Sequence, residues 1–199
     1  MTSHTTPLEY KSHQSQMNIL GFWVFLGAEI VLFATLFASY FVLEHNTAGG
    51  PGGGADIFVL KDVLIETFLL LTSSFTSGLA IHAMRNHDKK GLLLWMIATL
   101  LLGAGFLFME INEFLHFIHE GATIQTSGFT AGLFTLLGTH GAHVTFGIIW
   151  ISLLLVQLVR RGITEKTSSK LFIASLYWHF LDVVWIFIFT FVYLKGMVM

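Results

Sequence analysis

The sequence predicts an all-α integral membrane protein built as a bundle of five transmembrane helices. Hydrophobic residues make up 54% of the 199 residues and charged residues only 11%, whereas an ordinary soluble domain has roughly 25% charged residues. Five apolar runs are each long enough to cross a bilayer, which takes ~20 helical residues. These runs cover residues 19–43, 62–84, 91–118, 129–159 and 171–194. They are too long and too continuously apolar for barrel strands, so we expect helices.

Composition also excludes several classes of function. The formal net charge of −2 gives no basic signature for nucleic-acid binding. The absence of Cys excludes disulfides, thiolate catalysis, iron–sulfur clusters, covalent c-type haem attachment and thiolate copper sites. A redox centre on this chain would have to rest on His, Met, Tyr or carboxylates.

The segments before and after the first helix are polar. Residues 1–18 have no basic stretch followed by a short apolar core, so we expect a solvated polar tail rather than a signal peptide. The glycine-rich segment 47–56, after the first helix, predicts a flexible loop. It has neither the following Lys-Ser/Thr nor the preceding strand of a phosphate-binding loop, so we expect no nucleotide site there.

The basic residues of the four connections and the two ends predict the orientation. With five crossings, the tail and the loops at 85–90 and 160–170 lie on one side of the membrane and carry eight of the ten Lys and Arg residues. The other side has only Lys61 and Lys195. Because cytoplasmic loops are enriched in basic residues, we expect a cytoplasmic N-terminus and a C-terminus outside. An even number of crossings would destroy this bias.

Ionisable side chains inside a membrane helix are functional candidates by default, since they are costly to bury. Counting from the helix entrances places five of them near the midplane: Glu29, His140, His143, His179 and Asp182. A second set is expected in the outer half of the membrane: Glu66, Glu110, Glu113 and His116.

Three chemistries are compatible with these residues. Glu113-x-x-His116 matches half of a di-iron carboxylate motif, but the chain has no second copy of it. Bis-His haem ligation could join His140 or His143 to His179, although the two separated His pairs of a dihaem cytochrome are missing. The favoured interpretation is that the midplane His and Asp residues act as polar contacts between closely packed helices. The outer set is expected to be a hydrated cluster at the interface. We therefore expect no metal site and no catalytic residue.

Glu29 stands apart, because no basic residue lies near it in sequence or at the same estimated depth. Ten residues into an apolar helix, or ~15 Å deep, an ionised carboxylate would be expensive. We expect it to be protonated. Its role stays open between a proton relay, a reagent-reactive acid and a structural hydrogen-bond donor.

Four segments together resemble a known family. GFWVFLGAEIVLF (21–33), GAGFLFMEINEF (103–114), GTHGAHVTFGIIW (138–150) and YWHFLDVVWIFIFTFVYL (177–194) are similar to subunit III of the haem-copper terminal oxidases. Many members of that family have seven helices. The five-helix form expected here resembles that of bacterial quinol oxidases. The sequences of these segments are most similar to the Bacillus-type menaquinol oxidase.

This resemblance implies an accessory subunit of a proton-pumping quinol oxidase in the bacterial plasma membrane. The subunit would carry no cofactor, would pack on a catalytic subunit I that holds the haems and copper, and would bind phospholipid in a cleft. Glu29 would match the family's buried helix glutamate, and His140, His143, His179 and Asp182 its polar core. The absent first helix pair leaves open any cleft contacts that longer members draw from it.

Three other functions remain as alternatives. The chain could be subunit III of a cytochrome c oxidase or the related accessory protein of nitric oxide reductase. From a different class, it could be a stand-alone proton-coupled transporter using Glu29 and Asp182. The sequence disfavours the transporter, because it shows neither an inverted repeat nor a pair of broken helices.

Overall fold

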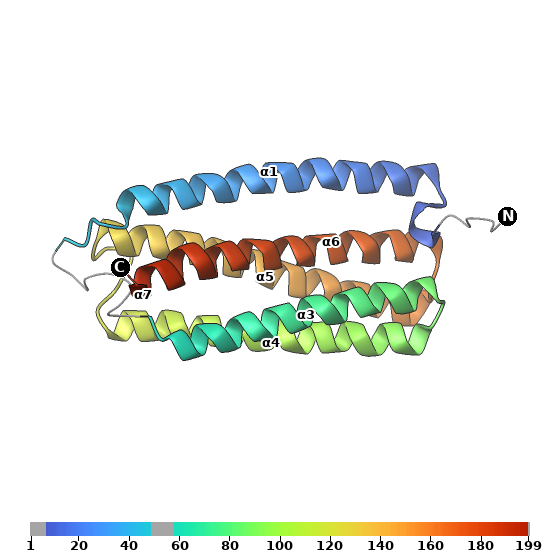
Figure 1. The fold of residues 1–199 in the computed structure, drawn as a ribbon. Helices are drawn as coiled ribbons and strands as arrows, with labels where there is room; N and C mark the ends of the chain where they lie inside the picture. Colours follow the sequence, from blue (N-terminus) through green and yellow to red (C-terminus); the bar gives the residue numbers. More distant parts are fainter. Residues whose placement is uncertain (1–6, 49–57, 199) are drawn as a thin grey trace.

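The computed structural model describes residues 7–48 and 58–198, and within these ranges all regular structure is helical (Figure 1). The elements are the 3₁₀ helix η1 (Leu8–Tyr10), α1 (His13–Leu43), α3 (Leu60–Arg85), α4 (Lys89–His119), α5 (Gly128–Arg161), α6 (Glu165–Ile188), the π-helix η2 (Phe189–Leu194) and α7 (Lys195–Val198). Five helical segments are long and apolar enough to cross a membrane, the last running from Glu165 to Met197. The predicted all-helical class and its five spans are confirmed. Most of the glycine-rich loop at 47–56 lies outside the described residues.

The helices begin before the apolar runs because their capping residues lie in the polar flanks. Ser12 accepts a hydrogen bond from the backbone N–H of Ser15 and starts α1, and Thr164 caps α6 through the N–H of Thr167. Side-chain oxygens at this position satisfy N–H groups that have no partner inside the helix. The first turns of α1 and α6 are therefore polar, whereas the apolar runs begin only at residues 19 and 171.

Residues 7–12, which precede α1, are folded, whereas composition predicted a solvated tail. Glu9, in η1, is fully buried, and its Oε1 accepts hydrogen bonds from Nε and Nη2 of Arg85 at 2.9 and 2.7 Å. The ring of Tyr10 packs edge-on against Phe172 of α6. A long-range ion pair of this kind leaves no periodic signal in the sequence, so a polar stretch could not reveal it.

The helices pack around α6, which contacts α1, α3 and α5, while α4 packs against α3 and α5. In Figure 1, α6 lies between α1 and the α3–α4 pair. The indole N–H groups of Trp178 and Trp185 donate to Ser73 Oγ and Thr67 Oγ1 at 2.9 and 3.0 Å. These bonds join α6 to α3 in the centre of the bundle, where both indoles are buried.

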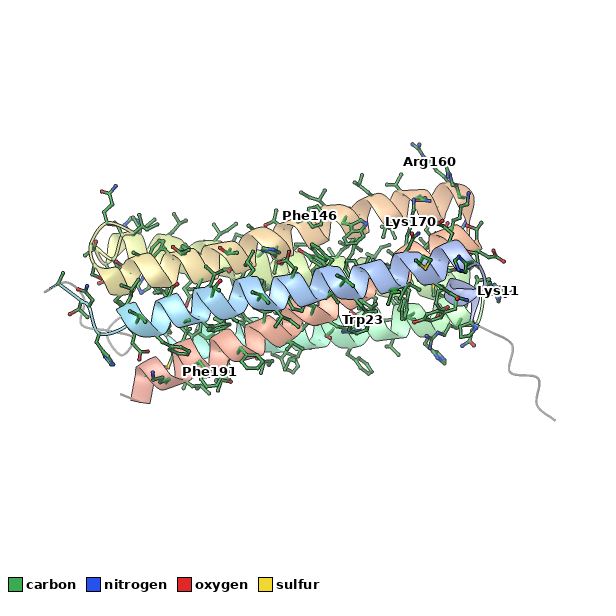
Figure 2. All side chains as sticks on the ribbon, turned by 90° about the horizontal axis from the view of Figure 1, so that it is seen from above. Lys11, Trp23, Phe146, Arg160, Lys170 and Phe191 are labelled. Atoms are coloured by element: carbon green, nitrogen blue, oxygen red, sulfur yellow. The ribbon has the colours of Figure 1, made fainter. Side chains whose placement is uncertain are left out.

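The basic residues lie at the two ends of the bundle in the distribution expected for five crossings. Figure 2 shows Lys11, Arg160 and Lys170 together at one end, which we call the basic end. The alternating direction of the helices brings the same eight residues to it: Lys11, Arg85, Lys89, Lys90, Arg160, Arg161, Lys166 and Lys170. Lys61 and Lys195 lie at the opposite end. Between the ends, large apolar side chains such as Trp23 and Phe146 are exposed on the outside of the bundle (Figure 2), as expected for a lipid-facing surface.

Candidate functional site

Glu29 lies in the middle of α1 and faces His143 of α5. Its Oε2 is 3.2 Å from Nε2 of the imidazole, and the two side chains are 13% and 22% exposed. The other ring nitrogen of His143, Nδ1, is 2.7 Å from the carbonyl oxygen of Thr139. Because a carbonyl oxygen only accepts, Nδ1 carries a proton. The proton between Nε2 and Glu29 is then shared: the carboxyl group donates it to a neutral ring, or an imidazolium donates it to a carboxylate.

Sequence reasoning missed this pairing. It placed Glu29 and His143 at similar depths but could not establish that α1 packs against α5, nor which faces meet. Counting residues from each helix entrance estimates depth only, and contact between helices depends on packing that the apolar pattern does not encode. Figure 1 shows α1 at the edge of the bundle, where α5 and α6 are its neighbours.

His140 is one turn from His143 but lies in a different environment. It is fully buried, and neither ring nitrogen has a hydrogen-bond partner among the described residues. Its ring stacks on Trp185 with centroids 5.5 Å apart and meets Phe106 edge-on at 5.9 Å. His140 is therefore enclosed by aromatic rings in the centre of the bundle.

His179 and Asp182 form a third polar group, on the side of α6 that faces α3. Nδ1 of His179 is 2.7 Å from Ser74 Oγ and 3.8 Å from Asp182 Oδ2. Asp182 is almost fully buried, and neither of its carboxyl oxygens has a hydrogen-bond partner in the described part of the chain. The four residues expected to form one polar core thus occupy three separate places.

The outer set lies around a cavity between α3 and α4, at the end opposite the basic end. Glu66, Glu113 and His116 line this cavity of about 330 Å³ together with Asp62, which sequence reasoning did not select. Glu66 is almost completely buried, and its Oε2 has no hydrogen-bond partner among the described residues. A space of this size and polarity accommodates several water molecules, as expected for a hydrated cluster.

The remaining member, Glu110, is buried against Gly141 of α5. A Cβ atom at Gly141 would lie 2.8 Å from Glu110 Oε2, so the carboxyl group in this position would have to shift if Gly141 carried a side chain. Nearby, the π-helix η2 places the buried Tyr193 so that its hydroxyl donates to Glu113 Oε2 at 2.5 Å. Single π-helical turns often occur at functional sites, and Tyr193 is a further residue that the sequence pattern did not indicate.

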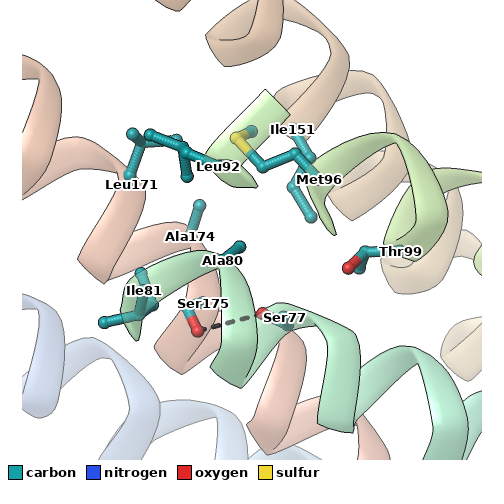
Figure 3. A pocket seen from close by; sticks show the side chains of 10 residues that line it. All are labelled: Ser77, Ala80, Ile81, Leu92, Met96, Thr99, Ile151, Leu171, Ala174 and Ser175. Atoms are coloured by element: carbon teal, nitrogen blue, oxygen red, sulfur yellow. Dashed lines mark hydrogen bonds between the residues drawn. The ribbon is translucent and has the colours of Figure 1, made fainter. Parts of the chain in front are cut away.

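Two other spaces have different chemistry. Figure 3 shows a small cavity of about 20 Å³ among α3, α4, α5 and α6, where the hydroxyls of Ser77 and Ser175 are 3.0 Å apart. It has room for a single water molecule. An apolar groove of about 420 Å³ runs between α1 and α6 and is lined by side chains such as Phe33, Phe37 and Phe187.

Within residues 7–48 and 58–198, no group of three or more His, Asp or Glu side chains is placed to hold a metal ion. The arrangement supplies shared protons, buried carboxyl groups and apolar surface.

Comparison with known proteins defines the class to which this bundle belongs. Residues 5–197 match the model of the family described as cytochrome c oxidase subunit III. This chain belongs to that family, as the resemblance of its four sequence segments predicted.

Individual relatives match over nearly their whole length. The chain is 62% identical to quinol oxidase subunit 3 of Bacillus subtilis (strain 168) over 191 residues, which are 96% of this chain and 93% of the relative. It is 51% identical to probable quinol oxidase subunit 3 of Staphylococcus saprophyticus, covering all of this chain and 98% of the relative. It is also 51% identical to cytochrome c oxidase subunit 3 of Bacillus sp. (strain PS3), covering 93% and 89%.

Proposed function

We propose that this chain is the accessory subunit III of a proton-pumping quinol oxidase in the bacterial plasma membrane. The observation that carries the proposal is the 62% identity to a quinol oxidase subunit 3 over 96% of this chain. Quinol oxidation and the reduction of oxygen to water take place on partner subunits, with haems and copper on catalytic subunit I. This chain supports assembly, lipid binding and sustained proton uptake.

In this role the Glu29–His143 pair is the proton-active site of the subunit. An ionised carboxylate alone in the membrane interior costs several kcal/mol. Hydrogen bonding to Nε2 of His143 at 3.2 Å lets the pair hold one proton without exposing a charge to lipid. His140, His179, Asp182 and the outer cluster then stabilise helix contacts and hold water.

The apolar groove between α1 and α6 supports the proposed binding of phospholipid. All eleven lining residues are apolar, and the groove of about 420 Å³ runs along the C-terminal half of α1 and the end of α6 into η2. An acyl chain placed there would cover exposed Phe side chains without leaving any polar group unsatisfied. The phospholipid would lie between this subunit and its neighbours.

Purification from the native membrane tests the proposal. A tagged copy of this chain, extracted in a gentle detergent, should bring down haem-bearing partner subunits and quinol-dependent oxygen consumption. If the chain isolates without any haem-bearing partner, it is not an oxidase subunit, and the stand-alone proton-coupled transporter becomes the better interpretation.

The second candidate is subunit III of a cytochrome c oxidase, with the related accessory protein of nitric oxide reductase as a further variant. The 51% identity to cytochrome c oxidase subunit 3 of Bacillus sp. (strain PS3) favours keeping it. The electron donor separates the two candidates. The purified complex should oxidise quinol and leave reduced cytochrome c unchanged, whereas the reverse preference would assign the chain to a cytochrome c oxidase.

A further inference from the structure

His179 is the most exposed of the five ionisable side chains expected near the membrane midplane. Its side chain is 42% exposed, against 13% for Glu29, 22% for His143 and 8% for Asp182. The residue lies well inside the span from Glu165 to Met197. At that depth lipid tails offer no hydrogen bonds, so an exposed imidazole facing lipid is unfavourable.

The two nitrogens of this ring face different directions. Nδ1 lies 2.7 Å from Ser74 Oγ and 3.8 Å from Asp182 Oδ2, inside the bundle. Nε2 makes no hydrogen bond with any described residue, and it is not among the buried side-chain atoms that lack a partner. Nε2 therefore opens outward from the bundle with its hydrogen-bonding capacity unused.

The helix beside His179 presents small groups at this position. On α3, Ser74 and Gly78 are one turn apart on the same face. Gly78 is exposed, and a Cβ atom there would meet nothing within 4 Å. Small residues allow the backbone of another membrane helix to approach closely, and polar side chains then hydrogen-bond across the contact.

Other outward faces of the bundle at this depth suit lipid. They present large apolar side chains such as Leu101 on α4 and Phe146 on α5. Exposed hydroxyls elsewhere are satisfied within their own helices: those of Ser39 and Thr135 donate to backbone carbonyls one turn earlier. The α3–α6 face is distinguished by an outward nitrogen that no described residue of this chain satisfies.

We propose that Ser74, Gly78 and His179, with Asp182 buried behind the ring, form the centre of a docking surface for a transmembrane helix of another oxidase subunit. That helix places a hydrogen-bonding side chain against Nε2 of His179. The inference rests on the proposed function, because it takes its partner from the oxidase complex. Beyond the proposed function, the inference specifies the face of this subunit that contacts its partner. It also specifies that the partner helix presents a hydrogen-bonding side chain to His179.

Two substitutions at His179 separate outward docking from an internal role. Gln places a polar atom near the position of Nε2, whereas Asn places one near Nδ1 and preserves the contact with Ser74. We expect His179→Gln to keep this chain in the complex within twofold of wild type. The complex that carries His179→Asn should lose this chain at least threefold more readily than the wild-type complex. The readout is the ratio of this chain to haem in the purified whole complex after repeated detergent washing.

An internal structural role predicts the opposite order, since only Asn retains the contact with Ser74. Equal retention of the two variants, or better retention of His179→Asn, would overturn the proposal. The measurement uses the assembled complex and does not depend on turnover.

Photo-cross-linking in the intact membrane tests the surface independently. A benzophenone amino acid replaces Phe75 or Ile186, which are exposed beside the cluster on α3 and α6, or Leu101 or Phe146 as matched controls on other faces. We expect the first pair to give adducts with another oxidase subunit and the controls to give mainly lipid adducts. Lipid adducts alone at Phe75 and Ile186, adducts only with a second copy of this chain, or equal protein adducts at the controls would each overturn the docking surface.

The two proposals fail in different ways. If the chain does not purify with haem-bearing subunits at all, the proposed function fails. If it does purify with them and Phe75 and Ile186 react only with lipid, the function stands and the docking surface is elsewhere.

Discussion

At the scale of single residues, the pairing of Glu29 with His143 changes what a substitution of the glutamate should do. Gln retains an amide N–H that can donate to Nε2 of His143, so Glu29→Gln should preserve the 3.2 Å contact while removing the exchangeable carboxyl proton. Because oxygen is reduced on another subunit in the proposed complex, the initial rate of quinol oxidation should stay within about threefold of wild type, less than ~0.7 kcal/mol of barrier. Oxygen uptake by the assembled complex measures this rate. Immediate loss of turnover in an intact complex would place Glu29 on an obligatory proton path.

Truncation at the same position should have a different effect. Glu29→Ala leaves a cavity and an unpaired imidazole nitrogen, at a cost of roughly 1–3 kcal/mol to the packing of α1 on α5. We expect a normal initial rate followed by faster loss of activity during sustained turnover. Comparing the decay of activity with that of Glu29→Gln separates loss of the carboxyl proton from loss of the contact. Identical decay of activity in wild type and Glu29→Ala would show that this pair does not support sustained turnover.

The sequence indicated the important residue types but not their partners. The depth of Glu29, His140, His143, His179 and Asp182 could be estimated by counting, because an α-helix rises by a constant amount per residue. Which of them meet depends on the rotation of each helix about its axis. That rotation is set by packing around Trp178 and Trp185, and an almost uniformly apolar helix gives no periodic signal for it.

At the scale of helices, contact between α4 and α6 depends on a glycine. A Cβ atom at Gly103 would lie 2.6 Å from the Trp178 ring, whereas one at Gly105, on the same helix, would lie 3.7 Å from Leu69 Cδ1. We therefore expect Gly103→Ala to destabilise the bundle by about 1–3 kcal/mol through overpacking. Gly105→Ala should be close to neutral. Thermal unfolding of the purified complex, followed by release of this chain, measures both, and equal midpoints would contradict the close packing at Gly103.

The N-terminal segment provides a second prediction for an element. Glu9 is buried, whereas the side chain of Arg85 is half exposed. Neutralising Glu9 weakens both hydrogen bonds from Arg85, because hydrogen bonds between charged groups are roughly twice as strong as neutral ones. Glu9→Gln should therefore release η1 from Arg85 and expose the peptide bond after Lys11 to trypsin. The matched control is Glu120→Gln, because Glu120 is exposed at the opposite end of the bundle. Cleavage of inside-out membrane vesicles should be faster for Glu9→Gln than for wild type and Glu120→Gln, and unchanged cleavage would show that the ion pair does not hold the segment.

The helices themselves were predictable because each apolar run exceeds the thickness of the bilayer. Their polar first turns were not, since Ser12 and Thr164 lie outside the runs and act through capping hydrogen bonds. The π-helix η2 could not be predicted from the apolar pattern either, because the wider turn of a π-helix is not marked by any change in the hydrophobicity of its residues. The position of Tyr193 against Glu113 depends on that turn.

At the scale of the whole molecule, the distribution of basic residues predicts the orientation in the membrane. Eight of ten Lys and Arg residues belong to the basic end, so this end should be cytoplasmic. Reporter fusions at Gly53 and after Met199 should both report the outside, and a fusion after His87 should report the cytoplasm. A cytoplasmic signal at Gly53 or Met199 would refute the five-span orientation.

The separation of the histidines also predicts the spectrum of the isolated chain. Bis-His haem ligation needs two imidazoles facing each other across a gap wide enough for the macrocycle. His140 stacks on Trp185, Nε2 of His143 faces Glu29, and His179 opens away from the bundle beside Ser74. Since no two of these rings face a common space, the chain purified alone should show no Soret band, while the whole complex should show one. A Soret band that stays with the isolated chain in stoichiometric amount, and is lost on substitution of one of these histidines, would assign a haem to this subunit and overturn its accessory role.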